Sequence, residues 1–186
     1  MKIIVGISGA TGPIYGIRLL EALDQAGVET HLILSEWAEK TIAIETTYTV
    51  DYVKGLASYI YNTSNQAAVI SSGSFITDGM IIAPCSMKTL ASISFGLADN
   101  LISRSADVVL KENRKLVILP REAPLNQIHI ENMLRLSKMG VVINPPMPAF
   151  YNHPQSVDDI INHTVARTLD QFGIDNQLTK RWLQKT

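Results

Sequence analysis

The sequence predicts a single α/β domain built on a three-layer, doubly wound parallel sheet of the Rossmann-like or flavodoxin-like kind. Two observations predict this class. Short segments are nearly continuous in Ile, Val and Leu, as in strands covered on both faces. Helical patterns of about 10–15 residues alternate with those segments, which indicates right-handed β-α-β units. A length of 186 residues fits one domain, 1–186.

Each element follows from its local pattern. The apolar runs predict strands at Lys2–Ser8, Thr30–Ser35, Gly79–Pro84, Lys115–Pro120 and Gly140–Asn144. Apolar residues at helical spacing predict helices at Pro13–Ala26, Glu36–Thr46, Ser86–Ala98, Ile102–Lys111, Gln127–Met139 and Ser156–Phe172. The Ser-, Asn- and Gly-rich stretch 62–78 predicts a long loop with one short strand at Ala67–Ile70. The amphipathic tail Asp175–Thr186 predicts a C-terminal helix that docks on the same domain.

Composition excludes several classes of protein. Hydrophobic residues make up 46% and charged residues 18%, which excludes intrinsic disorder. A net charge of −1 gives no basic field for nucleic acid. The single cysteine, Cys85, excludes an intramolecular disulfide. No apolar stretch approaches the ~18–20 residues of a membrane span, and the N-terminal run is too short for a signal peptide, so we expect a cytoplasmic protein without membrane partners.

The turn after the first strand, Ser8-Gly9-Ala10-Thr11-Gly12, predicts a phosphate site. In an open parallel sheet, ligands bind beyond the carboxyl ends of the strands, and this turn feeds the N-terminus of a helix. Gly6, Gly9 and Gly12 lie at intervals of three, so they do not form a dinucleotide fingerprint, and no Gly-Lys-Ser/Thr follows. The alternative interpretation is a tight strand–helix turn that holds no ligand.

Two later turns carry further candidates. In Ser86–Thr89 the first residue can cap a helix, while Lys88 and Thr89 add a cation and a hydroxyl. In Pro120-Arg121-Glu122-Ala123-Pro124 the arginine suits a phosphate or carboxylate, although a surface ion pair is the alternative. Cys85 has no histidine near it in sequence, which favours a buried, inert thiol.

Glu45 stands in an apolar setting, where burial would raise its pKa toward acid–base use. A solvated helix end is the alternative for this residue. The four histidines, at positions 31, 129, 153 and 163, do not cluster with one another or with acidic residues. The sequence therefore predicts no metal site.

Several strings in order resemble the UbiX family of flavin prenyltransferases, which is also associated with phenolic and aromatic acid decarboxylases. The strings are Ser8–Gly12, Ser-Ser-Gly-Ser at 71–74, Pro-Cys-Ser at 84–86, Asn-Leu-Ile-Ser-Arg-Ser-Ala-Asp-Val at 100–108, Pro-Arg-Glu-Ala-Pro at 120–124 and His-Ile-Glu-Asn-Met at 129–133. The resemblance runs from about Lys2 to Trp182. It implies transfer of a dimethylallyl group from dimethylallyl monophosphate to N5 and C6 of reduced FMN, without a metal. The product, prenylated FMN, would serve a separate UbiD-type decarboxylase.

Roles for individual residues follow from the resemblance alone. It implies FMN-binding residues at Gly9, Ala10, Thr11, Ser35, Ser86, Met87, Lys88, Thr89 and Arg121. It implies catalytic roles for Glu45, Glu122 and Lys111, and a grip on the donor phosphate for Tyr151 and Arg167. It also implies a large homo-oligomer, such as a dodecamer, with sites at interfaces, so that Tyr151 and Arg167 would serve a neighbour's flavin.

One departure and three alternatives accompany the resemblance. Some members carry a Trp shortly before the Ser-Gly-Ser loop, whereas residues 65–70 read Asn-Gln-Ala-Ala-Val-Ile here. A peptidyl-cysteine decarboxylase of the same fold would need a His after the second strand, where Ser35-Glu36-Trp37-Ala38 stands. An FMN-carrying subunit of a decarboxylase would leave the candidate catalytic residues unexplained. A dinucleotide oxidoreductase conflicts with the glycine spacing.

Overall fold

The computed structural model describes residues 1–183, and within them the chain forms one six-stranded parallel sheet in the order β3-β2-β1-β4-β5-β6. The strands are β1 (Lys2–Ile7), β2 (Glu29–Leu34), β3 (Tyr59–Asn62), β4 (Gly79–Cys85), β5 (Lys115–Pro120) and β6 (Val142–Ile143). The chain moves outward from β1 through β2 to β3, then returns to β4 and moves outward on the other side. This order confirms the predicted doubly wound sheet, with its switch point between β1 and β4.

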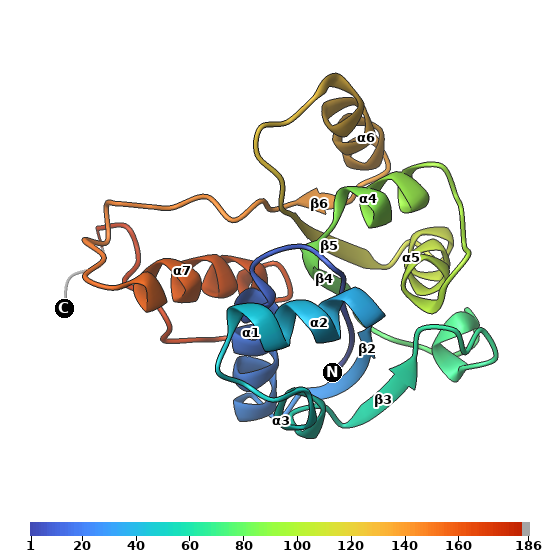
Figure 1. Ribbon diagram of the computed structural model, residues 1–186, viewed down its shortest axis with the longest axis horizontal. Helices are drawn as coiled ribbons and strands as arrows, with labels where there is room; N and C mark the ends of the chain where they lie inside the picture. Colours follow the sequence, from blue (N-terminus) through green and yellow to red (C-terminus); the bar gives the residue numbers. More distant parts are fainter. Residues whose placement is uncertain (184–186) are drawn as a thin grey trace.

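Helices cover both faces of the sheet, which gives the three predicted layers (Figure 1). The helices are α1 (Pro13–Gln25), α2 (Glu36–Glu45), α3 (Val50–Gly55), α4 (Met87–Ser94), α5 (Leu101–Lys111), α6 (Gln127–Lys138) and α7 (Val157–Asp170). Buried residues of α1, α2, α3 and α7 pack on one face, and those of α4, α5 and α6 pack on the other. None of the helices found between residues 1 and 183 is long and apolar enough to cross a membrane.

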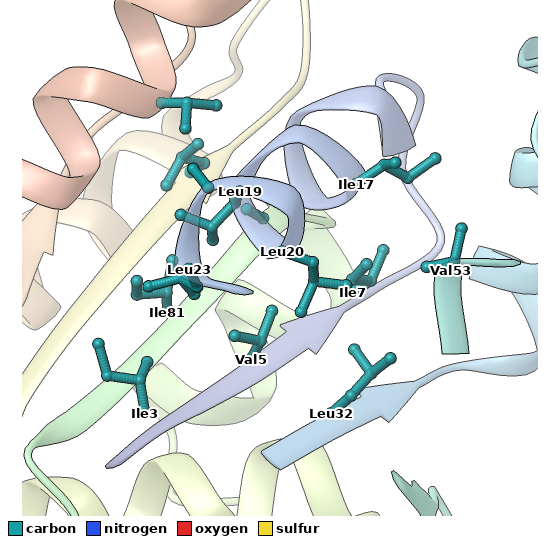
Figure 2. Packing of buried hydrophobic residues seen from close by; sticks show 14 of the residues in the cluster. Ile3, Val5, Ile7, Ile17, Leu19, Leu20, Leu23, Leu32, Val53 and Ile81 are labelled. Carbon is teal, nitrogen blue, oxygen red and sulfur yellow. The ribbon is translucent and has the colours of Figure 1, made fainter. Parts of the chain in front are cut away.

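The core follows the alternation of side chains along each strand. In β1, Ile3, Val5 and Ile7 face α1, while Ile4 faces the layer of α4 and α5. Figure 2 shows the first three beside leucines of α1 and Leu32 of β2. All are buried, and each such side chain contributes about 1.5–3 kcal/mol. This packing fixes α1 against the centre of the sheet and so fixes the turn that precedes it.

Gly16 lets α1 approach β4 closely. A Cβ at this position would lie 2.3 Å from the carbonyl oxygen of Ala83, which is well inside van der Waals contact. The close approach brings the N-terminus of α1 to the carboxyl ends of β1 and β4, where a ligand would bind.

The five predicted strands are observed, although β6 is only two residues long. Two elements, α3 and β3, were not predicted. α3 spans six residues, too short for a clear helical period, and β3 is an edge strand with largely exposed side chains. The short strand predicted at Ala67–Ile70 is wrong, because this loop contains a 3₁₀ turn at Val69–Ser71.

The predicted C-terminal helix is wrong over residues 175–183, which form turns and bends, and residues 184–186 lie outside the described part. Gly173, with φ of 66°, closes the end of α7. Side chains then compete for the backbone, since Asn176 Nδ2 donates to the carbonyl of Ile174. The tail still docks on the domain, because Leu178 packs against the core.

Candidate functional site

A cleft of about 550 Å³ opens at the carboxyl ends of β1, β2 and β4, beside the switch point of the sheet. Five of the predicted site residues line it, namely Gly9, Ser35, Ser86, Lys88 and Thr89. The other lining residues are Glu36, Trp37, Asn62, Thr63, Ser64, Ser92, Asp99, Asn100 and Ile102. Its volume lies in the range of about 300–1,000 Å³ that is usual for small-molecule and cofactor sites.

Ser8 ties the turns after β1 and β4 together. Its buried hydroxyl donates to the carbonyl of Pro84 at 2.9 Å and accepts from the backbone N–H of Ser86 at 2.8 Å. A buried polar group with both partners satisfied holds its neighbours rigidly. The turns that supply Gly9 and Ser86 to the cleft are therefore held in place before a ligand binds.

Trp37 stands directly against Gly9. A Cβ on Gly9 would lie 2.2 Å from the Cβ of Trp37, so any other residue at position 9 forces the two segments apart. Trp37 is 65% exposed although it is a large aromatic residue. The sequence interpretation missed its role at the cleft. A tryptophan three residues after β2, at the start of α2, was the available signal, because residues at the carboxyl ends of the strands face the ligand.

Glu45 reaches the first turn from the end of α2. Its Oε2 accepts from the hydroxyl of Thr11 and from the backbone N–H of Gly12, both at 2.8 Å. Gly12 is the N-cap of α1, with φ of 87° and no side chain to cap the helix, so the carboxylate supplies the missing acceptor. Glu45 is exposed, so the burial suggested by its apolar sequence setting is absent in this chain.

Three helix N-termini meet at the cleft. The side chains of Ser35, Ser86 and Asn100 cap α2, α4 and α5, and all three line the cleft. Each N-terminus carries a partial positive charge and spare N–H groups, which favour an anion. Lys88 adds a full positive charge, while Glu36 and Asp99 stand at the same walls. The arrangement can hold a phosphate ester next to a polar, hydrogen-bonding wall.

Arg121 follows β5 and lies beside the cleft rather than in its lining. Its backbone N–H donates to the carbonyl of Cys85, and its guanidinium lies near Tyr15. Burial raises the pKa of Tyr15, and the charge of Arg121 partly opposes that rise. Three other predicted residues, Ala10, Thr11 and Met87, also belong to these turns without lining the cleft, and Glu122 is exposed at the end of β5. Cys85 is buried, as predicted, and this burial raises the pKa of its thiol to about 12.

Lys111 lies at the opposite edge of the sheet, at the end of α5. Its ammonium pairs with Glu112, and both pack against Gly73 of the Ser-Ser-Gly-Ser loop. Arg114 holds that loop by donating to the carbonyls of Gly73 and Phe75, and Lys2 at the start of β1 lies over the Phe75 ring. Parallel strands of six residues are about 20 Å long, so Lys111 is far from the cleft of its own chain.

Tyr151 and Arg167 form a third group, on α7 and the segments around it. The Tyr151 ring packs edge-on against His163 at 5.5 Å and Trp182 at 5.2 Å. Arg167 follows His163 by one helical turn and donates to Asp170 at 2.6 Å. Figure 1 shows the connection from β6 to α7 as an extended segment that runs away from the sheet. Tyr151 and Arg167 thus both lie beside His163, and neither lines the cleft of the same chain.

The comparisons with known proteins assign the family. The sequence profile of the Flavoprotein family matches residues 1–169. A "Probable UbiX-like flavin prenyltransferase" from Bacillus subtilis is 63% identical over 182 residues, which cover 98% of this chain and 89% of that protein. This chain belongs to the UbiX-like flavin prenyltransferase family. The family predicted from the turn motifs is thus confirmed.

Solved structures of UbiX-like proteins have the same fold as this family member. A dodecameric FMN-dependent UbiX-like decarboxylase from Escherichia coli O157:H7 is 60% identical, with a TM-score of 0.97 over 99% of this chain and 100% of that chain. AnUbiX, solved with FMN and dimethylallyl pyrophosphate, is 51% identical, with a TM-score of 0.97 over 100% of this chain and 98% of that chain. The peptidyl-cysteine decarboxylase EpiD, at 18% identity and a TM-score of 0.58, shares the fold alone.

Proposed function

We propose that this UbiX-like chain joins the dimethylallyl group of dimethylallyl monophosphate to N5 and C6 of reduced FMN. The bond between the allylic carbon and the phosphate oxygen breaks and phosphate leaves. New bonds from the prenyl group to N5 and C6 close a fourth ring, and each of these flavin atoms loses its proton. The double bond of the prenyl group takes up one of the two protons, and the other leaves with the phosphate. The observation that carries the proposal is the preformed cleft where three helix N-termini meet beside Lys88. Its chemistry suits FMN, the phosphate ester bound by the relative AnUbiX.

The residues of the cleft bind and orient FMN. We assign its phosphate to the helix N-termini and Lys88, and its ring system to the turn Gly9–Thr11 with Ser35 and Arg121. Reduced FMN supplies electron-rich N5 and C6 atoms when it is bound. The hydrogen bonds of Glu45 keep the first turn in one conformation, so the flavin-binding surface needs no rearrangement.

The departing phosphate needs cations and the allylic group needs shelter from water. We assign the phosphate to Tyr151 and Arg167, with Lys111 and Glu122 in supporting roles at the reacting groups. Within one chain, Tyr151 and Arg167 form one group, whereas Lys111 and Glu122 lie elsewhere. A large homo-oligomer, like the dodecameric relative, would bring Tyr151 and Arg167 of one subunit to the cleft of another.

We propose a UbiD-type decarboxylase in the cytoplasm as the recipient of prenylated FMN. A second candidate function, FMN-dependent decarboxylation, has one observation in its favour, because the 60% identical E. coli relative is described as a decarboxylase. The two functions differ in the fate of the flavin, since only prenyl transfer changes its mass.

Variants of the two arginines test the site assignment. Arg121→Ala and Arg167→Ala should each lower prenyl transfer at least about 100-fold, because each removes a charge-assisted contact to a phosphate-bearing substrate. The assay follows formation of prenylated flavin from FMN, a reductant and dimethylallyl monophosphate without oxygen. Circular dichroism should show an unchanged fold. Unchanged turnover in both variants would contradict the assignment.

A further inference from the structure

Two arginines share one carboxylate beside the C-terminal end of α7. Arg181 donates from both terminal nitrogens to the two oxygens of Asp170, at 2.7 Å for the Nη2–Oδ1 pair. Arg167 donates from Nη1 to Oδ2 of the same carboxylate at 2.6 Å. Hydrogen bonds from Arg181 hold the pKa of Asp170 below its usual range although burial opposes them. The trio therefore carries a net charge of +1 next to Tyr151.

The two arginines are used differently. Arg181 binds Asp170 through both terminal nitrogens of its guanidinium, and its side chain is 34% exposed. Arg167 makes a single side-chain hydrogen bond within residues 1–183, and its side chain is 51% exposed. A guanidinium has five N–H donors, so Arg167 keeps about four for another partner. Arg181 therefore mainly binds Asp170, whereas Arg167 has donors left over for a ligand.

An isolated ion pair between two residues three apart on a helix would not hold the Arg167 side chain in one position. Exposed ion pairs at this spacing contribute little and leave the side chains mobile. Here Asp170 is itself fixed by the bidentate contact from Arg181 and by Nδ2 of Asn176 at 3.4 Å. Arg181 directly precedes Trp182, which contacts the Tyr151 ring. The tail therefore orders Arg167 and Tyr151 together.

We propose that Asp170 and Arg181 are positioning residues that hold the guanidinium of Arg167 ready for the phosphate of the prenyl donor. The inference rests on the proposed function, which gives Arg167 that phosphate. A preordered arginine loses no rotamer freedom when the donor binds, so the effect belongs in donor affinity. Neither Asp170 nor Arg181 needs to touch the donor for this effect.

Two conservative variants test the proposal. Asp170→Asn keeps the shape of the side chain and removes its charge, while Arg181→Lys keeps the charge and removes the fork. Each should raise the KM for dimethylallyl monophosphate about tenfold, leave kcat within about twofold and leave the KM for FMN unchanged. For Asp170→Asn, the direction in which the donor KM changes distinguishes positioning from simple electrostatic attraction. Simple attraction predicts a lower donor KM there, because the variant makes the site more positive.

Two further variants separate the possible failures. Glu21→Gln removes the carboxylate of another arginine pair at the same helical spacing, Arg18 with Glu21 on α1, and should change neither KM. Arg167→Lys tests the proposed function itself, because an unchanged donor KM there removes Arg167 from the phosphate site. A raised donor KM in Arg167→Lys with unchanged values in Asp170→Asn and Arg181→Lys would overturn the positioning role alone. A lower kcat together with raised KM values for both dimethylallyl monophosphate and FMN would also overturn it, since such changes indicate a merely structural role.

Discussion

At the residue scale, Gly9 is the position where the backbone geometry decides function most directly. Gly9→Ala places a Cβ 2.2 Å from the Cβ of Trp37, so the first turn must move away from α2. We expect the Kd for FMN to rise at least about tenfold, because the turn is part of a preformed binding surface. Fluorescence titration with FMN measures this change.

Gly55→Ala is the matched control for Gly9→Ala. Gly55 ends α3, and a Cβ at this position would meet no atom within 4 Å among the described residues outside its own helix backbone. Its φ also lies outside the positive range, so alanine fits the backbone there. The control should bind FMN like the unaltered protein. A Gly9→Ala variant that binds FMN equally well would contradict the role of the turn.

The sequence identified five of the fourteen residues that line the cleft. Gly9, Ser86, Lys88 and Thr89 lie in turns that follow predicted strands and carry suitable chemistry, whereas Ser35 was implied by the family resemblance alone. Asn62 and Thr63 were missed because they lie at the carboxyl end of β3, which was itself missed. Asn100 was missed as a lining residue because only the packing of α5 against the sheet brings its N-terminus to the cleft.

At the scale of elements, two serine N-caps allow the effect of a cap on protein stability to be measured separately from its effect on FMN binding. Ser86 caps α4 at the cleft, and Ser156 caps α7 elsewhere; each hydroxyl accepts from a backbone N–H at 3.2 Å. Replacing either serine by alanine should cost about 1 kcal/mol of unfolding free energy. Only Ser86→Ala should also weaken FMN binding, because its helix N-terminus faces the ligand.

Urea unfolding and FMN titration of Ser86→Ala and Ser156→Ala measure these two effects. Equal FMN affinity in the two variants would show that the N-terminus of α4 does not contact the flavin phosphate. Unchanged unfolding free energy in both would contradict the capping roles.

The edge strand β3 predicts a pH dependence of stability. His31 of β2 is buried, stacks on Tyr59 of β3 at 4.8 Å, and lies with Nδ1 2.9 Å from the Tyr61 hydroxyl and Nε2 3.0 Å from Glu29. Burial lowers the pKa of His31, and the hydrogen bond to Glu29 only partly opposes this. The unfolded chain therefore binds a proton near pH 6.5 that the folded chain does not, so stability falls as pH drops below about 6.5.

Urea midpoints at pH 7.5 and 5.5 test this dependence. His31→Phe keeps the ring stack and removes the titrating group, so its midpoint should fall less between the two pH values. His163, whose pKa burial also lowers, should supply the remaining dependence. An equal fall in the variant and the unaltered protein would exclude His31 as a cause.

Strands were predicted correctly where burial on both faces of the sheet gives an unbroken apolar run in the sequence. β1, β2, β4 and β5 are such strands, and their bounds agree with the prediction to within one or two residues. β3 failed because an edge strand needs no such run, and its largely exposed Tyr59–Asn62 reads as loop. The tail failed because hydrogen bonds from Arg181 and Asn176 to Asp170, which no local pattern records, replace helical ones.

At the scale of the whole molecule, the proposed site residues lie at both ends of the parallel strands. Arg121 lies at the carboxyl ends, whereas α7 ends near the amino ends, where the carbonyl of Gln171 accepts from Lys115. An active site shared between subunits predicts complementation. Subunits with Arg121→Ala and subunits with Arg167→Ala, each inactive alone, should regain activity when they assemble together.

Coexpression of the two variants in equal amounts tests the shared site. About a quarter of the sites should then combine two intact residues and restore about a quarter of the activity, if subunits mix at random. Variants assembled separately and mixed without exchange serve as the control. No recovery in verified mixed assemblies would place Arg121 and Arg167 in the same chain's site or outside the site.

Prenyl transfer changes the mass of the flavin, so the mass of the released flavin tests the proposed function. The purified protein is incubated with FMN, a strong reductant and dimethylallyl monophosphate without oxygen. The flavin is then released and its mass is measured by mass spectrometry. Prenyl transfer predicts a flavin heavier than FMN by one five-carbon unit. Release of unmodified FMN from a protein that had bound it would contradict prenyl transfer and support a carrier or a decarboxylase.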